Sequence, residues 1–149
     1  MSAAQFLPYV IRRANWKRER ETLGRIRELV FVQEQRVPPE LEWDDRDAEA
    51  LHLLAETAAG QAIGTARMLT DGHIGRMAVL PQWRRCGVGS ALLRELVRIA
   101  REREGCTPFL NAQTRALGFY RRHGFVAEGG EFLDADIPHR RMILPPAEQ

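Results

Sequence analysis

The chain has 149 residues, 44% of them hydrophobic and 28% charged, and its 22 basic and 20 acidic residues leave a net charge of +2. This balance is typical of one globular domain, which we place at residues 1–149, with the core between about 7 and 145 and a short polar C-terminal tail. Basic and acidic residues are interleaved, which argues against a nucleic-acid partner. No apolar run of about 18 residues and no leader pattern occurs, so we expect no membrane partner and a cytoplasmic location.

Apolar periodicity predicts the elements of the first half of the chain. Alternating apolar residues predict four strands, at 7–12, 51–56, 62–69 and 73–80. Helical spacing predicts a helix over 17–33, capped at its N-terminus by Asn15. The acidic, proline-broken stretch 36–49 is expected to be a loop or a short irregular helix. Asp71 and Gly72 separate the last two strands, which is a strong hairpin signal.

The second half is dominated by a long amphipathic helix that begins at a glycine loop. Apolar residues recur at helical spacing after Gly89, and Gly105 is a suitable C-terminal stop. The remaining elements are a strand at 108–112, a short helix at about 114–123 and two strands at 125–132 and 139–144. This order of strands and helices is that of a mixed α/β fold.

The loop before the long helix has the chemistry of a phosphate site. The first N–H groups of a helix lack intrahelical partners and attract anions. Gly87 and Gly89 allow the backbone to approach a phosphate closely, and Arg84 and Arg85 can add charge-assisted contacts. A pyrophosphate is the ligand that these features favour. An ordinary glycine turn with solvated arginines is the alternative.

Two common nucleotide-binding motifs do not fit this loop. The run from Gly87 to Leu92 lacks the third glycine of the dinucleotide-binding fingerprint. A phosphate-binding loop of the Walker A type needs a lysine, and the only lysine of the chain is Lys17. Another class of pyrophosphate ligand is therefore expected.

The run Arg84-Arg85-Cys86-Gly87-Val88-Gly89 resembles the Gln/Arg-x-x-Gly-x-Gly/Ala signature of the GNAT N-acetyltransferase superfamily, whose loop holds the pyrophosphate of coenzyme A. Further stretches resemble landmarks of its small bacterial ElaA-like branch, in the same order and over nearly the whole chain. These stretches are Phe31–Gln35, His52–Ala55, Gly75–Val79, Leu110–Gln113, Phe119–Phe125 and Ile137–His139. Two positions depart from the pattern, because Arg85 and Asp136 stand where glycine is common in the branch.

The resemblance implies both a fold and an activity. The implied fold is a mixed, mostly antiparallel sheet of about six or seven strands with about four flanking helices. Its fourth and fifth strands splay apart to admit the pantetheine arm of coenzyme A. The implied activity is direct transfer of the acetyl group of acetyl-CoA to a primary amine of a small molecule or peptide. No metal is implied, and a homodimer is an alternative to a monomer.

The resemblance also implies roles for particular residues. The cofactor-binding loop would comprise Arg84, Arg85, Cys86, Gly87, Val88, Gly89 and Ser90. Backbone N–H groups of Met77, Ala78 and Val79, on a bulged strand, would bond the thioester carbonyl, and Asn111 would bond the pantetheine. Tyr120 would lie near the sulfur of coenzyme A and act as general acid.

The amine also needs a base, since deprotonating a lysine-like amine at pH 7 costs roughly 4.6 kcal/mol. Glu34 and His139 are the candidates.

Each of these roles has a structural alternative. Tyr120 and Asn111 could simply pack, His139 could bond the backbone, and Glu34 could be a helix-end carboxylate. Cys86, at the phosphate end, is disfavoured as an acyl carrier. The acidic stretch 40–45 suggests a cationic acceptor or a solvated loop.

Two other functions remain as alternatives. The first is an acyl-CoA-binding sensor or interaction module without turnover. The second is an enzyme like the acyl-homoserine lactone synthases, which share the fold and are usually longer.

Overall fold

The computed structural model describes residues 8–146. Seven strands form one sheet in the order β1-β2-β3-β4-β5-β7-β6. They are β1 (Tyr9–Ala14), β2 (Leu51–Thr57), β3 (Ala62–Met68), β4 (His73–Val79), β5 (Phe109–Gln113), β6 (Val126–Asp134) and β7 (Ile137–Ile143). The α-helices are α1 (Trp16–Arg27), α2 (Pro39–Glu42), α3 (Val88–Arg101) and α4 (Leu117–Arg122). The mixed, mostly antiparallel architecture expected from the sequence is confirmed.

Shorter helical turns complete the chain. A π-helical segment, η2 (Glu28–Glu34), continues α1, so the single predicted helix over 17–33 is an α-helix followed by a wider turn. The remaining turns are η3 (Asp47–Glu49), η4 (Pro81–Trp83) and η5 (Thr114–Ala116). None of the helices in residues 8–146 is long and apolar enough to cross a membrane.

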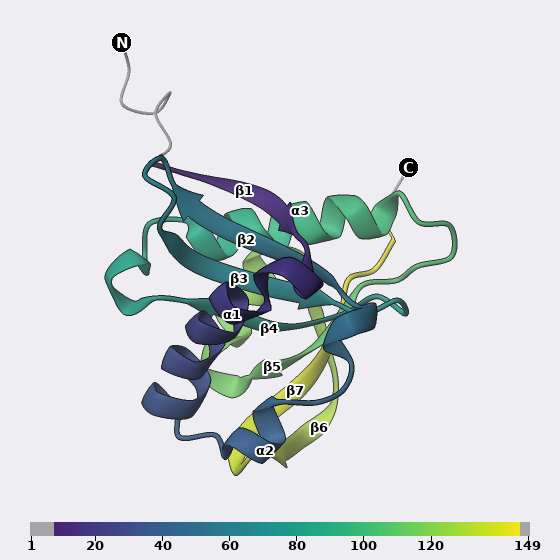
Figure 1. The fold of residues 1–149 in the computed structure, drawn as a ribbon. Coiled ribbons are helices and arrows are strands. Elements are labelled where there is room, and N and C mark those ends of the chain that lie inside the picture. The colour runs from purple at the N-terminus through teal and green to yellow at the C-terminus, as the bar shows by residue number, and fades with distance from the viewer. Residues whose placement is uncertain (1–7, 147–149) are drawn as a thin grey trace.

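Helices cover both faces of the sheet, with α1 in front of it and α3 behind it (Figure 1). Buried leucines of α3 join the larger apolar core, and Leu23 and Ile26 of α1 join a second cluster with Leu54 and Ala78. The cap predicted for α1 is present, since the Arg18 N–H donates to the Asn15 side chain at 3.0 Å. Two apolar layers therefore clamp strands β2 to β4.

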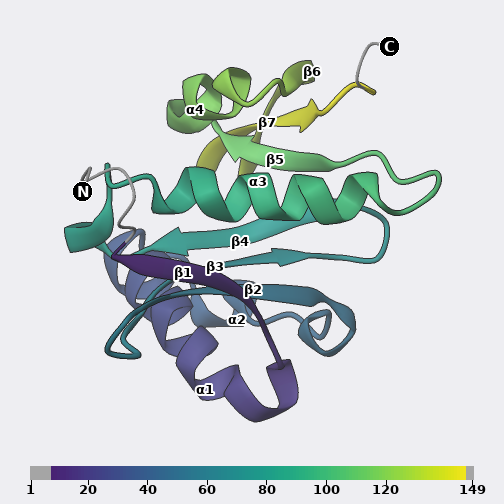
Figure 2. The same cartoon turned by 90° about the horizontal axis from the view of Figure 1, so that it is seen from above.

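The sheet opens between β4 and β5. These parallel strands pair only at His73 with Phe109 and at Ile74 with Leu110. Beyond this point β5, β7 and β6, together with α4, separate from β1 to β4, as Figure 2 shows from above. The splay implied by the resemblance is therefore present, and it leaves the edge of β4 without a strand partner near its C-terminal end.

A bulge lies in β4 beside this opening. The register against β3 shifts between Thr65, which faces Ala78, and Arg67, which faces Gly75. Arg76 takes up the extra residue in a left-handed conformation, with φ of 49°. A bulge re-aims the backbone after it, so the last residues of β4 turn toward the opening.

Candidate functional site

The glycine loop ends in free N–H groups at the start of α3. Gly87 is the N-cap in a left-handed conformation, with φ of 82° and no side-chain cap. The first intrahelical bond runs from the Ala91 N–H to the Gly87 carbonyl at 3.0 Å. The N–H groups of Val88, Gly89 and Ser90 therefore have no intrahelical acceptor, and the loop fits an anion.

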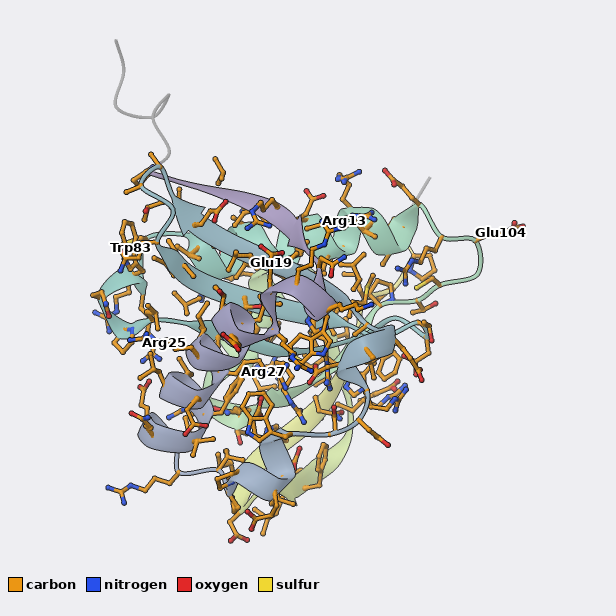
Figure 3. The ribbon with its side chains drawn as sticks, viewed as in Figure 1. Arg13, Glu19, Arg25, Arg27, Trp83 and Glu104 are labelled. Carbon is orange, nitrogen blue, oxygen red and sulfur yellow. The ribbon has the colours of Figure 1, made fainter. Side chains whose placement is uncertain are left out.

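A long-range hydrogen bond holds this loop. The Tyr9 hydroxyl donates to the Cys86 carbonyl at 3.2 Å, and the Tyr9 ring meets Trp83 edge to face with centroids 6.4 Å apart. Figure 3 shows Trp83 at this end of the molecule. The buried tyrosine of β1 thus fixes the backbone just before Gly87.

The two arginines of the motif differ in position. Arg84 donates to both carboxylate oxygens of Glu34 at 2.6 Å, and its Nε donates to the Val79 carbonyl at 3.0 Å. Arg85 is exposed, with φ of 63°, and makes no ion pair within residues 8–146. Of the two guanidinium groups, only that of Arg85 is therefore unengaged beside the loop.

The N–H groups at the end of β4 alternate in direction. The Leu80 N–H donates to the Ile63 carbonyl of the β3 side at 2.9 Å. In an antiparallel ladder the next N–H along the strand points the other way, so that of Val79 points away from β3. Because Ala78 faces Thr65, the same alternation turns the Ala78 N–H toward β3, whereas the direction of the Met77 N–H is set by the bulge at Arg76. The backbone N–H groups of Met77, Ala78 and Val79, which the resemblance proposes as donors to the thioester carbonyl, therefore do not all point in the same direction.

Predicted site residues from four elements meet in one cavity between β4 and β5. The cavity has a volume of about 200 Å³, and Met77, Asn111, Tyr120 and His139 all line it. These residues come from β4, β5, α4 and β7. Positions spread over 63 residues of the sequence, from 77 to 139, are therefore brought to one place by the splay.

Tyr120 presents a protonated hydroxyl. Burial raises the pKa of Tyr120 to about 12. Its ring is held edge to face by Phe119 and Phe125, with centroids 5.0 and 6.1 Å away. At neutral pH this phenol keeps its proton and can donate it.

His139 presents a proton acceptor. Its Nδ1 lies 2.6 Å from the Ile137 carbonyl, and its ring stacks on Phe132 at 5.9 Å. A carbonyl oxygen can only accept, so Nδ1 carries the hydrogen and the Nε2 of the neutral ring carries the lone pair. The local contact sets the tautomer that a general base needs.

Glu34 is engaged elsewhere. It lies at the end of η2 and lines a larger outer cavity of about 650 Å³ with Gln35, Gln113, Thr114 and Arg115. The hydrogen bonds from Arg84 lower the pKa of Glu34, and Arg115 lowers it further. A carboxylate held in this way is a poor proton acceptor.

The acidic stretch 40–45 is solvated only in part, because Glu42 is buried and Asp44 is half-buried while the other four residues are exposed. Glu42 is buried, and its carboxylate accepts a hydrogen bond from the buried Arg27 at 2.7 Å. Asp44 bonds Arg67 at 2.8 Å and Arg76 at 3.2 Å. Because arginines neutralise both carboxylates, these residues give no support to the suggestion of a cationic acceptor.

Three site residues were not identified from the sequence. Arg76 occupies the bulge, and Gln35 and Gln113 join in a hydrogen bond of 2.9 Å across the mouth of the opening. All three lie inside stretches that resemble family landmarks. Only the resemblance of those stretches could have pointed to these three residues, because their spacing in the sequence does not indicate that they lie close together.

Comparison with known proteins agrees with this geometry. The Acetyltransferase (GNAT) domain family matches residues 27–145. The uncharacterized N-acetyltransferase YjcF of Bacillus subtilis is 38% identical over 122 residues, covering 79% of this chain and 86% of that protein. The crystal structure of an acyl-CoA N-acyltransferase from Pseudomonas aeruginosa is 30% identical with a TM-score of 0.79, over 93% of this chain and all (100%) of that one.

A third relative shares the fold. Escherichia coli ElaA superimposes with a TM-score of 0.80 at 24% identity, over 93% of this chain and 100% of that one. With the family match, the identities and the splayed sheet in agreement, the chain belongs to the GNAT acetyltransferase family and is an acyltransferase.

Proposed function

We propose that the protein transfers the acetyl group of acetyl-CoA directly to a primary amine of a small molecule or peptide. One observation carries the proposal: a phenol that can give a proton and an imidazole that can take one line the same 200 Å³ cavity in the opening of the sheet. Tyr120 and His139 supply these two groups, and the anion-binding loop lies at the start of α3.

Acetyl-CoA would bind along β4. Its pyrophosphate would accept from the N–H groups of Val88, Gly89 and Ser90, with Arg85 adding charge. Its pantetheine would enter the opening, where the Val79 N–H and the Asn111 side chain can bond its amides. Cys86 would contribute its backbone, since its carbonyl is held by Tyr9.

The transfer then needs two proton movements. His139 Nε2 accepts a proton from the attacking amine while the nitrogen forms a bond to the thioester carbonyl carbon. The Met77 N–H stabilises the negative charge that develops on the carbonyl oxygen. As the carbon–sulfur bond breaks, Tyr120 donates its proton to the leaving sulfur. The products are the acetylated amine and free coenzyme A, and solvent then takes the proton from His139 and returns one to Tyr120.

The experiment is a transfer assay. The purified chain is mixed with acetyl-CoA and single amines chosen from amino acids, amino sugars, polyamines and lysine peptides, and both free thiol and acetylated product are measured. The proposal expects equal amounts of the two with at least one amine. Binding of acetyl-CoA without turnover on the whole panel would favour a sensor instead, and label retained on the protein would favour a covalent route.

A further inference from the structure

A side-chain hydrogen bond spans the mouth of the opening. Gln113 Nε2 donates to Gln35 Oε1 at 2.9 Å. Gln35 caps the C-terminal end of η2, which lies on the β4 side, and Gln113 is the last residue of β5. The bond therefore links η2, on the β4 side, to the end of β5, past the point at Ile74 and Leu110 where β4 and β5 separate.

This pair stands between three cavities. The outer cavity of about 650 Å³, the inner one of about 200 Å³ and a side cavity of about 90 Å³ are all lined by Gln35 and Gln113. Within residues 8–146 no other residue lines all three. His139, by contrast, lines only the inner and side cavities, while Glu34 lines only the outer one.

The orientation of both amides is fixed by a third residue. Arg115 Nε, which can only donate, bonds Gln113 Oε1 at 2.9 Å. The NH₂ group of Gln113 must then face Gln35, and Gln35 must offer its oxygen. The NH₂ group of Gln35 is left without a hydrogen-bond partner among residues 8–146, although the side chain is half-buried. Because this NH₂ group is not among the buried atoms that lack a partner, solvent reaches it, and a molecule that enters the cavity can contact it.

We propose that Gln35 and Gln113 form the acceptor gate: the pair that an amine contacts as it passes from the outer cavity to the thioester. This gate rests on the proposed function and adds to it the path by which the acceptor amine reaches the thioester. Passage parts the two amides, which frees the Gln35 oxygen to accept from the amine N–H. The closed pair keeps water of the outer cavity from the inner one. The gate sets acceptor affinity and limits hydrolysis, and it does not bind the pyrophosphate.

The test uses Gln35→Ala, Gln113→Ala and the double variant, with Gln33→Ala as the matched control. Gln33 is an exposed glutamine of the same η2 segment and lines none of the three cavities. With the amine that the wild type acetylates fastest, Gln35→Ala should raise the acceptor KM about tenfold, the effect of one lost hydrogen bond to a partly buried partner. Gln113→Ala leaves the Gln35 oxygen free and should not raise the acceptor KM. The KM for acetyl-CoA should change less than about twofold.

Two further readouts separate a gate from a general disturbance. Because Gln35 alone bonds the amine, the double variant should have about the same acceptor KM as Gln35→Ala. Hydrolysis of acetyl-CoA without any amine should increase in all three gate variants and stay unchanged in Gln33→Ala. This second readout decides the question even where no amine of the panel is acetylated.

Two results would overturn the gate. One is an acceptor KM and a hydrolysis rate that stay at wild-type values in both single variants. The other is an equal rise of both KM values, which would indicate a deformed cofactor slot. Failure of the proposed function is distinct, because it shows in the wild type as absence of acetyl-CoA binding or of any amine acetylation.

Discussion

Among single residues, Tyr120 makes the sharpest mechanistic prediction. Tyr120→Phe should lower kcat by about 10²-fold, the lower end of what a general acid contributes, and leave the affinity for acetyl-CoA unchanged. Because the pKa of Tyr120 is raised to about 12, the phenol stays protonated up to about pH 10, so it should cause no alkaline loss of rate below that pH. Steady-state kinetics and a binding titration check both. An unchanged kcat would remove Tyr120 from the mechanism.

The identity of the base is tested by a pair of substitutions. His139→Asn removes the Nε2 lone pair and should lower kcat by about 10²-fold. Glu34→Gln should change kcat less than about threefold, because its carboxylate is already held by Arg84. Initial rates at saturating acceptor decide between them. The reverse order of effects would assign the base to Glu34.

Single residues also show where sequence reasoning ends. Tyr120, Asn111 and His139 were placed from motifs, and the structure brings all three to the inner cavity. The ion pair of Arg84 with Glu34 joins positions 50 residues apart. Such a contact depends on how η2 and the glycine loop pack together, which no local pattern encodes.

Among the elements, the segment around α2 is held against the rest of the fold by buried ion pairs and hydrogen bonds between its acidic residues and arginines of other elements. Arg27 donates to Glu42 at 2.7 Å and to Asp47 at 2.8 Å. Arg76, at the β4 bulge, donates to the Glu42 carbonyl at 3.1 Å. The bulge and the α2 segment are thus coupled through one network. The sequence predicted an irregular segment here because of its prolines, but not the burial of its acids, since their arginine partners lie on other elements.

Removing one partner from this network should be costly. Glu42→Ala leaves the Nε of the buried Arg27 without its carboxylate partner, with only Asp47 still paired to the guanidinium, and should lower the free energy of unfolding by about 3–5 kcal/mol. The matched control is Glu40→Ala, an exposed residue of the same helix, expected to change it by less than about 0.5 kcal/mol. Urea denaturation of both variants gives the two values. If Glu42→Ala lowered the free energy of unfolding as little as Glu40→Ala does, the stabilising role of the network would be contradicted.

The network also predicts an acid dependence of stability. Burial alone would raise the pKa of Asp44, but hydrogen bonds from Arg67 and from the Arg46 N–H outweigh it and lower the pKa from 3.8 to about 2. A lowered pKa stabilises the folded state above the unfolded value, and this stabilisation is lost as pH falls from about 4 to about 2. Asp44→Asn should therefore flatten the acid side of a plot of unfolding free energy against pH. An identical slope in that range would contradict the assignment.

At the scale of the whole molecule, the fold is two parts held together at one end. Strands β4 and β5 share only two residue pairs, and the site lies where they separate (Figure 2). Periodicity predicted most of the strands and helices. The splay followed only from the resemblance, since the register of a parallel pair depends on the packing of elements far apart in sequence. The gate could not be predicted, because it exists only once the sheet has opened.

The most direct test of the account is a calorimetric titration of acetyl-CoA into the wild-type chain at low salt. We predict one binding site per chain, competition by free coenzyme A, and weaker binding in Arg85→Ala, whose guanidinium is the unengaged one at the loop. A wild-type chain that binds neither acetyl-CoA nor coenzyme A would contradict it.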